Sequence, residues 1–120
     1  MTPEARIQAA IEVLDEVLAG EAAEKALTSW GRRSRFAGSK DRAAVRDHVF
    51  QALRCRRSYA CLGGALSGRG LMLGGLRAAG VAPGSVFTGR GHAPAELQAD
   101  EIKAGAAPEA EGDRLALPDW

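Results

Sequence analysis

Basic side chains gather in the middle of the sequence, where "GRRSRFAGSKDRAAVRDHVFQALRCRRSY" spans residues 31–59. Planar guanidinium groups bind phosphate oxygens in pairs, and cations on a loop can follow the shape of an RNA backbone without reading its bases. A solvated loop and helix face would have the same composition, so the residues alone leave both interpretations open. If the stretch binds RNA, the candidate contacts are Arg32, Arg33, Arg35, Lys40, Arg46, Arg54 and Arg57.

The formal charge of +1 is the sum of four blocks of very different charge. Residues 1–30 carry two basic and six acidic side chains, net −4, and residues 31–60 carry nine basic and two acidic, net +7. Residues 61–90 carry three basic and no acidic side chains, net +3, and residues 91–120 carry two basic and seven acidic, net −5. A basic centre between acidic ends indicates a polyanionic partner such as nucleic acid. The open alternative is that these blocks neutralise one another within the fold.

No set of residues in the sequence has the spacing of a catalytic or metal-binding motif. Cys55 and Cys61 are spaced neither as a redox pair nor as a zinc knuckle, and His48 and His92 are too scattered to complete a metal site. We therefore expect two buried, reduced thiols, and neither a metal nor a cofactor in this chain. The "GRG" and "GG" glycines lack the strand–glycine–helix context of a phosphate loop, and they predict turns and helix crossings instead.

The elements that must position these residues are predicted to be helices. Aromatic residues make up only 5% of the 120-residue chain, and the apolar residues are largely Ala and Leu, which favours an all-α fold over a β-sandwich. In the first helix Thr2 can cap the start, Pro3 suits the first helical position and Gly20 ends it. Its apolar residues recur at helical spacing: Ile7, Ala10, Ile11, Leu14, Val17 and Leu18. A second helix is expected over about 22–32.

The third helix lies within the basic stretch and is predicted over about 40–57, with Ser39 as its cap. At about 100° per residue its apolar side chains form one core stripe. The stripe consists of Val45, Val49, Ala52 and Leu53. Arg42 and Arg56 fall inside this arc, so they must reach solvent, pair with carboxylates or bind carbonyls at helix ends. Phe50 points away from the stripe, which predicts a helix contacted on more than one side.

The rest of the chain is predicted to form shorter elements. They are a weak helix over 58–66, a turn at "SGRG", a helix over 70–79, irregular residues 81–92 and a last helix over 94–104. Residues 105–120 read as an acidic loop and linker, so the domain itself is expected to span 1–104. There is no run of eighteen apolar residues, and "TPEAR" after Met1 is not a secretion signal. We expect a cytoplasmic protein with no membrane partner.

Five segments resemble one protein family: "IQAAIEVLDEVL", "FAGSKDRAAVRDHVFQALR", "GRGLMLGGLRAAG", "FTGRGHAPAELQADE" and "LPDW". Over essentially its whole length the chain resembles the N-terminal region of the bacterial RsmB-like (Sun/Fmu-type) RNA cytosine-5 methyltransferases. The resemblance implies a NusB-like all-α bundle of about five to six helices with irregular loops, a domain that helps to seat ribosomal RNA. It also implies that "LPDW" leads into a Rossmann-like domain, where S-adenosylmethionine would bind.

The residues that carry the family's chemistry are missing from this sequence. The chemistry needs one cysteine that attacks the cytosine ring and a second that helps to release product, both in Pro- and Thr-flanked motifs of the downstream domain. Cys55 and Cys61 lie in a different context, so no catalytic role is transferred to them. The expected function is a non-catalytic RNA-binding domain of an rRNA methyltransferase, with rRNA and its own methyltransferase domain as partners. The alternatives are a protein-docking or structural helical module, and a NusB-type transcription antitermination factor.

Overall fold

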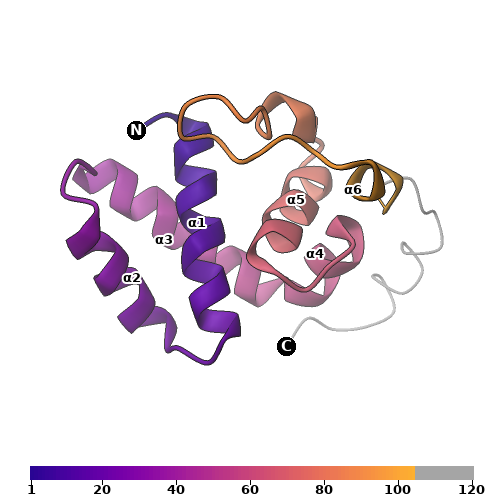
Figure 1. The fold of residues 1–120 in the computed structure, drawn as a ribbon. Coiled ribbons are helices and arrows are strands. Elements are labelled where there is room, and N and C mark those ends of the chain that lie inside the picture. Colours follow the sequence, from indigo (N-terminus) through magenta and orange to yellow (C-terminus); the bar gives the residue numbers. More distant parts are fainter. Residues whose placement is uncertain (105–120) are drawn as a thin grey trace.

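The computed structural model describes residues 1–104, which fold as a bundle of α-helices with no β-strand in that range (Figure 1). In chain order the elements are α1 (Pro3–Leu18), α2 (Ala23–Arg33), α3 (Ser39–Arg54), α4 (Arg56–Gly63), α5 (Gly68–Ala78), the 3-10 turn η1 (Pro83–Ser85) and α6 (Ala99–Ala104). The prediction of an all-α bundle of five to six helices is confirmed. None of these helices is long and apolar enough to cross a membrane. The predicted acidic loop and linker at 105–120 lie outside the described residues.

α1 is the helix around which the bundle is built, and it contacts α2, α3 and α5 (Figure 1). Its start is fixed as the sequence predicts, because the Ala5 N–H donates to Thr2 Oγ1 at 3.1 Å. Of the seven largest fully buried side chains within residues 1–104, all but Pro94 come from α1, α3 and α5. These six are Val13, Leu14, Val45, Val49, Leu71 and Leu73. Full burial of one such side chain stabilises the fold by about 1.5–3 kcal/mol, so this cluster holds α1, α3 and α5 together.

α3 is shorter than the sequence indicated, because the chain leaves the helix at Cys55, where φ is −108° and ψ is 27°. The backbone loses no hydrogen bond there: the Cys55 N–H donates to Gln51 O at 3.0 Å, and the Tyr59 N–H donates to Cys55 O at 2.9 Å. The helices predicted over about 40–57 and over 58–66 both form, but the first ends at Arg54 and the second spans Arg56–Gly63. Arg56 is the first residue of α4 and is exposed, so its predicted place on the core face is wrong.

The cap of α3 also differs from the prediction. Ser39 is the first helical residue, and the N-cap is Gly38, whose N–H donates to Asp41 Oδ2 at 3.1 Å. Asp41 also accepts from Arg6 Nε at 2.8 Å, which ties the start of α3 to α1. The hydrogen bonds from Arg6 and Gly38 hold the pKa of Asp41 below its ordinary value. The start of α3 is thus stabilised by the carboxylate of Asp41, three residues after the cap, and not by the Ser39 hydroxyl as predicted.

α4 and α5 cross with their backbones in contact, and glycine makes this possible. A Cβ on Gly74 would lie 1.9 Å from Tyr59 O, and one on Gly63 would lie 1.8 Å from Gly70 O. Any side chain at either position would therefore collide with backbone atoms of the other helix. The prediction that these glycines serve helix crossings is confirmed.

Two short elements differ from their predicted ranges. "SGRG" is not a free turn, since Ser67 caps α5 by accepting from the Gly70 N–H at 3.0 Å, and α5 begins at Gly68. The helix predicted over 94–104 is reduced to α6, because carbonyls before it have other donors. Pro94 O accepts from the Gly89 N–H at 2.8 Å, and Glu96 O accepts from Arg69 Nη2 at 2.8 Å.

Candidate nucleic-acid interface

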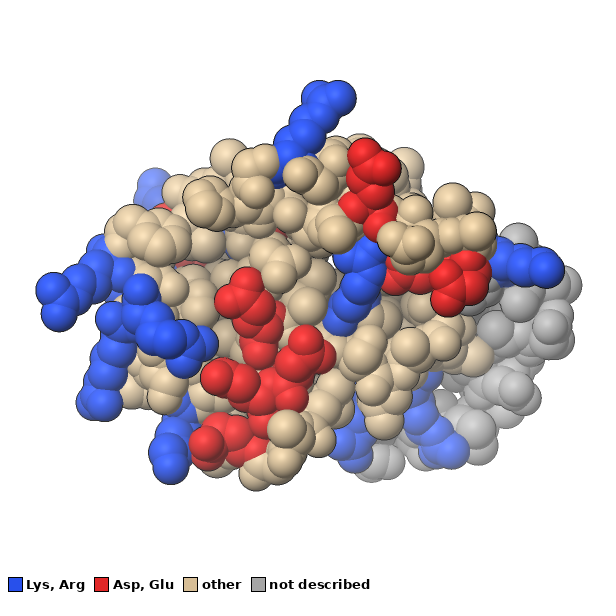
Figure 2. All heavy atoms as spheres, in the orientation of Figure 1, with Lys and Arg blue, Asp and Glu red and all other residues tan. Residues whose placement is uncertain are grey.

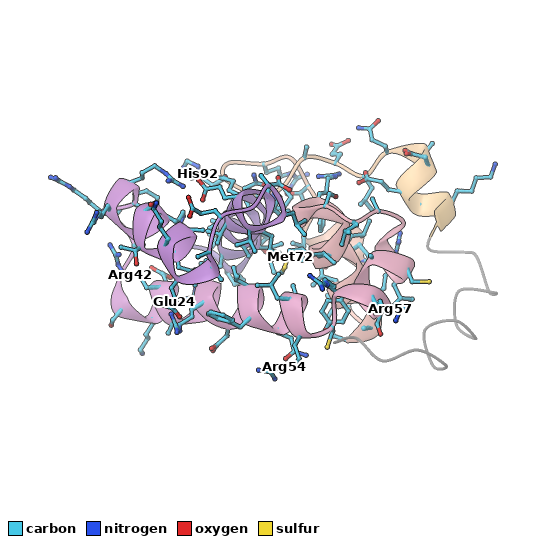
Figure 3. All side chains as sticks on the ribbon, turned by 90° about the horizontal axis from the view of Figure 1, so that it is seen from below. Glu24, Arg42, Arg54, Arg57, Met72 and His92 are labelled. Atoms are coloured by element: carbon cyan, nitrogen blue, oxygen red, sulfur yellow. The ribbon has the colours of Figure 1, made fainter. Side chains whose placement is uncertain are left out.

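Six of the seven predicted RNA contacts fall into two groups at the ends of α3, and the seventh, Arg46, lies between them. Arg32 and Arg33 end α2, and Arg35 and Lys40 lie in and just after the α2–α3 connection. Arg54 ends α3 and Arg57 lies in the first turn of α4. With a rise of 1.5 Å per residue, about 21 Å of helix separates the backbones of Lys40 and Arg54. In Figure 3, Arg54 and Arg57 lie well away from Arg42, which marks the α2 end of α3.

We call the first group the basic corner, which consists of Arg32, Arg33, Arg35 and Lys40. All four residues are exposed, and blue side chains gather over α2 and its connection to α3 in Figure 2. Arg33 lies 3.6 Å from a carboxylate oxygen of Glu16 on α1, with both side chains substantially exposed, so this pair is weak. Within residues 1–104, Arg32, Arg35 and Lys40 form no ion pair with a carboxylate. Their charges are therefore open to an external anion.

The backbone of the basic corner is held in place by Arg42. Its Nε donates to Ala37 O at 3.0 Å and its Nη2 donates to Ser34 O at 3.2 Å. The guanidinium passes over Gly31, where a Cβ would lie 2.5 Å from Arg42 Nη1. Of the three possibilities that the sequence left open for Arg42, the structure shows the binding of carbonyls at a helix end. The Arg42 guanidinium therefore stabilises the backbone of the α2–α3 connection, and we call Arg42 a scaffold residue of the basic corner.

Arg46 lies between the two groups and is occupied within the fold. Its guanidinium binds both carboxylate oxygens of Glu24 on α2, at 2.5 and 3.1 Å, and it stacks 4.9 Å from the ring centre of Phe50. The hydrogen bonds lower the pKa of Glu24 and raise the pKa of Arg46. Phe50 is half-buried and packs against the core beneath this arginine, although it lies off the predicted stripe. This agrees with the prediction that α3 is contacted on more than one side. An RNA contact by Arg46 stays a prediction, and it would have to compete with Glu24.

The face next to the basic corner has the opposite charge. Carboxylates lie across the middle of the molecule over α1 in Figure 2. An open groove runs between α1 and residues 85–95, and its α1 side includes Glu4, Glu12 and Asp15. These carboxylates would repel an anion from the α1 side of the groove.

The remaining chemical groups form no reactive cluster in the described part of the chain. Cys55 and Cys61 are unbridged, but they are half-buried and not fully buried as expected. No group of three or more His, Cys, Asp or Glu side chains that could hold a metal ion occurs within residues 1–104. Burial lowers the pKa of His48, which lies on the inner side of α3, while His92 is exposed beside the groove.

One exposed residue beside the basic corner was absent from the predicted contacts. Phe36 directly follows Arg35, and it is 71% exposed. An aromatic residue directly after an arginine-rich run in "RRSRFAGS" is a signal that the sequence carried. The sequence does not show, however, whether such an aromatic side chain is exposed or belongs to the core. Trp30, only six residues earlier, is 4% exposed.

No protein-family model, curated protein or solved structure matches this chain. The kinship with the NusB-like domain of RsmB-like methyltransferases thus stays a prediction carried by the sequence segments.

Proposed function

We propose that this chain is a non-catalytic RNA-binding domain that binds phosphates of structured RNA through the basic corner. We further propose that it seats ribosomal RNA for an S-adenosylmethionine-dependent cytosine-5 methyltransferase domain. The observation that carries the first part is the exposure of Arg32, Arg35 and Lys40 at one corner, without carboxylate partners among residues 1–104. The second part is carried by the sequence resemblance.

The charge distribution supports binding to a polyanion from one side. The connection that presents Arg35 is held by Arg42, so the cations would bind with little loss of backbone entropy. The acidic wall on α1 orients the molecule, because it repels the anion that the corner attracts. Phosphate contacts fix position but carry little sequence information, so choice of the target base would belong to the methyltransferase domain.

Charge reversal tests the RNA-binding part. The variant Arg32→Glu/Arg35→Glu/Lys40→Glu changes the net charge by −6, and Lys25→Glu/Arg90→Glu/Lys103→Glu makes the same change at exposed positions away from the corner. We expect affinity for a structured rRNA fragment at low salt to fall by about tenfold or more beyond the loss in the control. Equal losses in the two variants would contradict a localised site, because net charge alone would then explain binding.

The reading frame beyond residue 120 tests the methyltransferase part. A glycine-rich cofactor motif followed by two Pro-flanked cysteines supports it. A stop codon directly after the codon for Trp120 contradicts it and favours a free-standing RNA-binding protein such as an antitermination factor.

Protein docking is the second candidate function, and the groove beside α1 is the observation that favours it. Two features of α3 that a docking partner could have explained have internal explanations. Arg42 binds carbonyls of its own connection, and Phe50 packs under Arg46. A docking module that used the groove would be indifferent to the corner reversal and sensitive to Glu12→Lys in a pull-down with its partner.

A further inference from the structure

Phe36 is the most exposed of the large apolar side chains in the described part of the chain, at 71%, ahead of Leu66 at 61%. A single exposed apolar residue is ordinary on a protein surface. The position of this one is unusual, because Arg35 precedes it directly and the other three cations of the basic corner lie within four residues of it. An aromatic ring and four cations are therefore displayed together.

The backbone on both sides of Phe36 is anchored. Ser34 is 6% exposed and Ala37 is 5% exposed. The Ala37 N–H donates to Ser34 O at 3.0 Å, which closes a four-residue turn, and Arg42 donates to the carbonyls of both residues. Arg35 and Phe36 are the two central residues of that turn. The fold thus buries the base of the turn and holds its two tip residues toward solvent.

An exposed ring beside guanidinium groups matches the chemistry of single-stranded RNA. Every nucleobase has a flat apolar face that can stack on an aromatic side chain, and its neighbouring phosphates bind arginine and lysine. Paired bases hide these faces inside the helical stack, so only a base in a loop, a bulge or a strand end can offer one. Resting on the proposed RNA binding, we propose that Phe36 stacks on an unpaired nucleobase while the basic corner binds the flanking phosphates.

A protein partner is less well matched to this surface. Aromatic anchors of protein interfaces lie in apolar pockets and are surrounded by residues that exclude water. The other exposed large apolar residues, Leu66, Val81 and Ile102, belong to or follow α4, α5 and α6 and not to this corner. Phe36 also borders the groove beside α1. Among the described residues, no second exposed large apolar side chain accompanies it at this corner, and one ring is sufficient for stacking.

The experiment compares two RNAs and three variants of the 120-residue chain. One RNA is a hairpin with 2-aminopurine in its unpaired loop, and the other is a blunt duplex of the same length. The variants are Phe36→Ala, Phe36→Trp and the control Leu66→Ala, which truncates a similarly exposed side chain outside the basic corner. We expect Phe36→Ala to weaken hairpin binding by roughly 5- to 150-fold, the range for loss of one stacked base, and to leave duplex binding unchanged. Phe36→Trp and Leu66→Ala should bind both RNAs as the wild type does.

The fluorescence of 2-aminopurine reports stacking directly. It should change when the wild type or Phe36→Trp binds the hairpin, and it should not change when Phe36→Ala is driven onto it at high concentration. Unchanged hairpin affinity in Phe36→Ala overturns the stacking proposal, leaves RNA binding by the basic corner intact and assigns Phe36 to a protein contact. Equal losses for hairpin and duplex also overturn it, since the ring would then support the turn. If the wild type binds neither RNA, both the stacking proposal and the proposed function fail.

Discussion

Arg42 holds the shape of the basic corner, so replacing it should destabilise the domain more than replacing another arginine of α3. The substitution Arg42→Gln removes the charge and the guanidinium that donates to Ala37 O at 3.0 Å and to Ser34 O at 3.2 Å. Arg46→Gln, one helical turn later, is the matched control. It removes a guanidinium that binds an exposed carboxylate of Glu24.

The two costs differ because the acceptors differ in burial. Ser34 and Ala37 are 6% and 5% exposed, so their carbonyls have limited access to water once the donor is gone. A hydrogen bond to a charged group contributes about 1.5–3 kcal/mol, and partial replacement by water reduces the sum of two bonds to about 2 kcal/mol. For a domain of this size that corresponds to a melting temperature lower by about 8–16 °C. Exposed pairs such as Arg46–Glu24 contribute little to stability.

Thermal and urea unfolding followed by circular dichroism would measure the difference. We expect Arg42→Gln to lower the urea midpoint clearly and Arg46→Gln to change it little. Amide exchange should speed up at Ala37, whose N–H closes the turn by donating to Ser34 O. Equal stability of the two variants, or unchanged exchange at Ala37 in Arg42→Gln, would refute the scaffold role of Arg42.

Three further predictions concern the fold. Gly74→Ala should lower the free energy of unfolding in urea by about 1–3 kcal/mol or more, since its Cβ would lie 1.9 Å from Tyr59 O. The control Gly84→Ala, with no atom within 4 Å of the new Cβ, should be neutral or slightly stabilising. A Gly74→Ala variant as stable as the wild type would contradict the close helix crossing. Burial lowers the pKa of His48, so the folded state binds fewer protons there than the unfolded chain, and the free energy of unfolding should fall as the pH drops below about 6.5. His48→Gln should remove that part of the pH dependence in urea titrations, and identical profiles would rule it out. The hydrogen bonds to Asp41 lower its pKa, and their contribution should be lost only at more acidic pH, below about 4.

Local signals explain why α1 could be predicted from the sequence. Thr2, Pro3 and Gly20 mark its ends, and each acts within one turn of its own position. The break at Cys55 carried no such signal, because no glycine or proline occurs there and the apolar stripe continues to Leu53. Beyond the break, α4 packs closely against α5, through pairs such as Gly63 with Gly70 and Tyr59 with Gly74 that no local pattern marks.

The candidate site shows the same division between local and distant information. The four residues of the basic corner could be listed from composition, because a short connection keeps them together. The pairing of Arg46 with Glu24 joins positions twenty-two residues apart, and nothing local predicts it. Phe36 and Phe50 are indistinguishable as residue types, and only the packing shows that one faces solvent and the other the core.

The salt dependence of RNA affinity tests the central claim most directly. Counterion release gives a slope of log affinity against log salt of about −0.7 to −0.9 for each phosphate neutralised, so the four cations of the basic corner predict about −2.8 to −3.6. Removing three of them by Arg32→Ala/Arg35→Ala/Lys40→Ala should make the slope shallower by about 2–2.7. A flat slope in the wild type, or the same steep slope in the triple variant, would contradict phosphate binding at the basic corner.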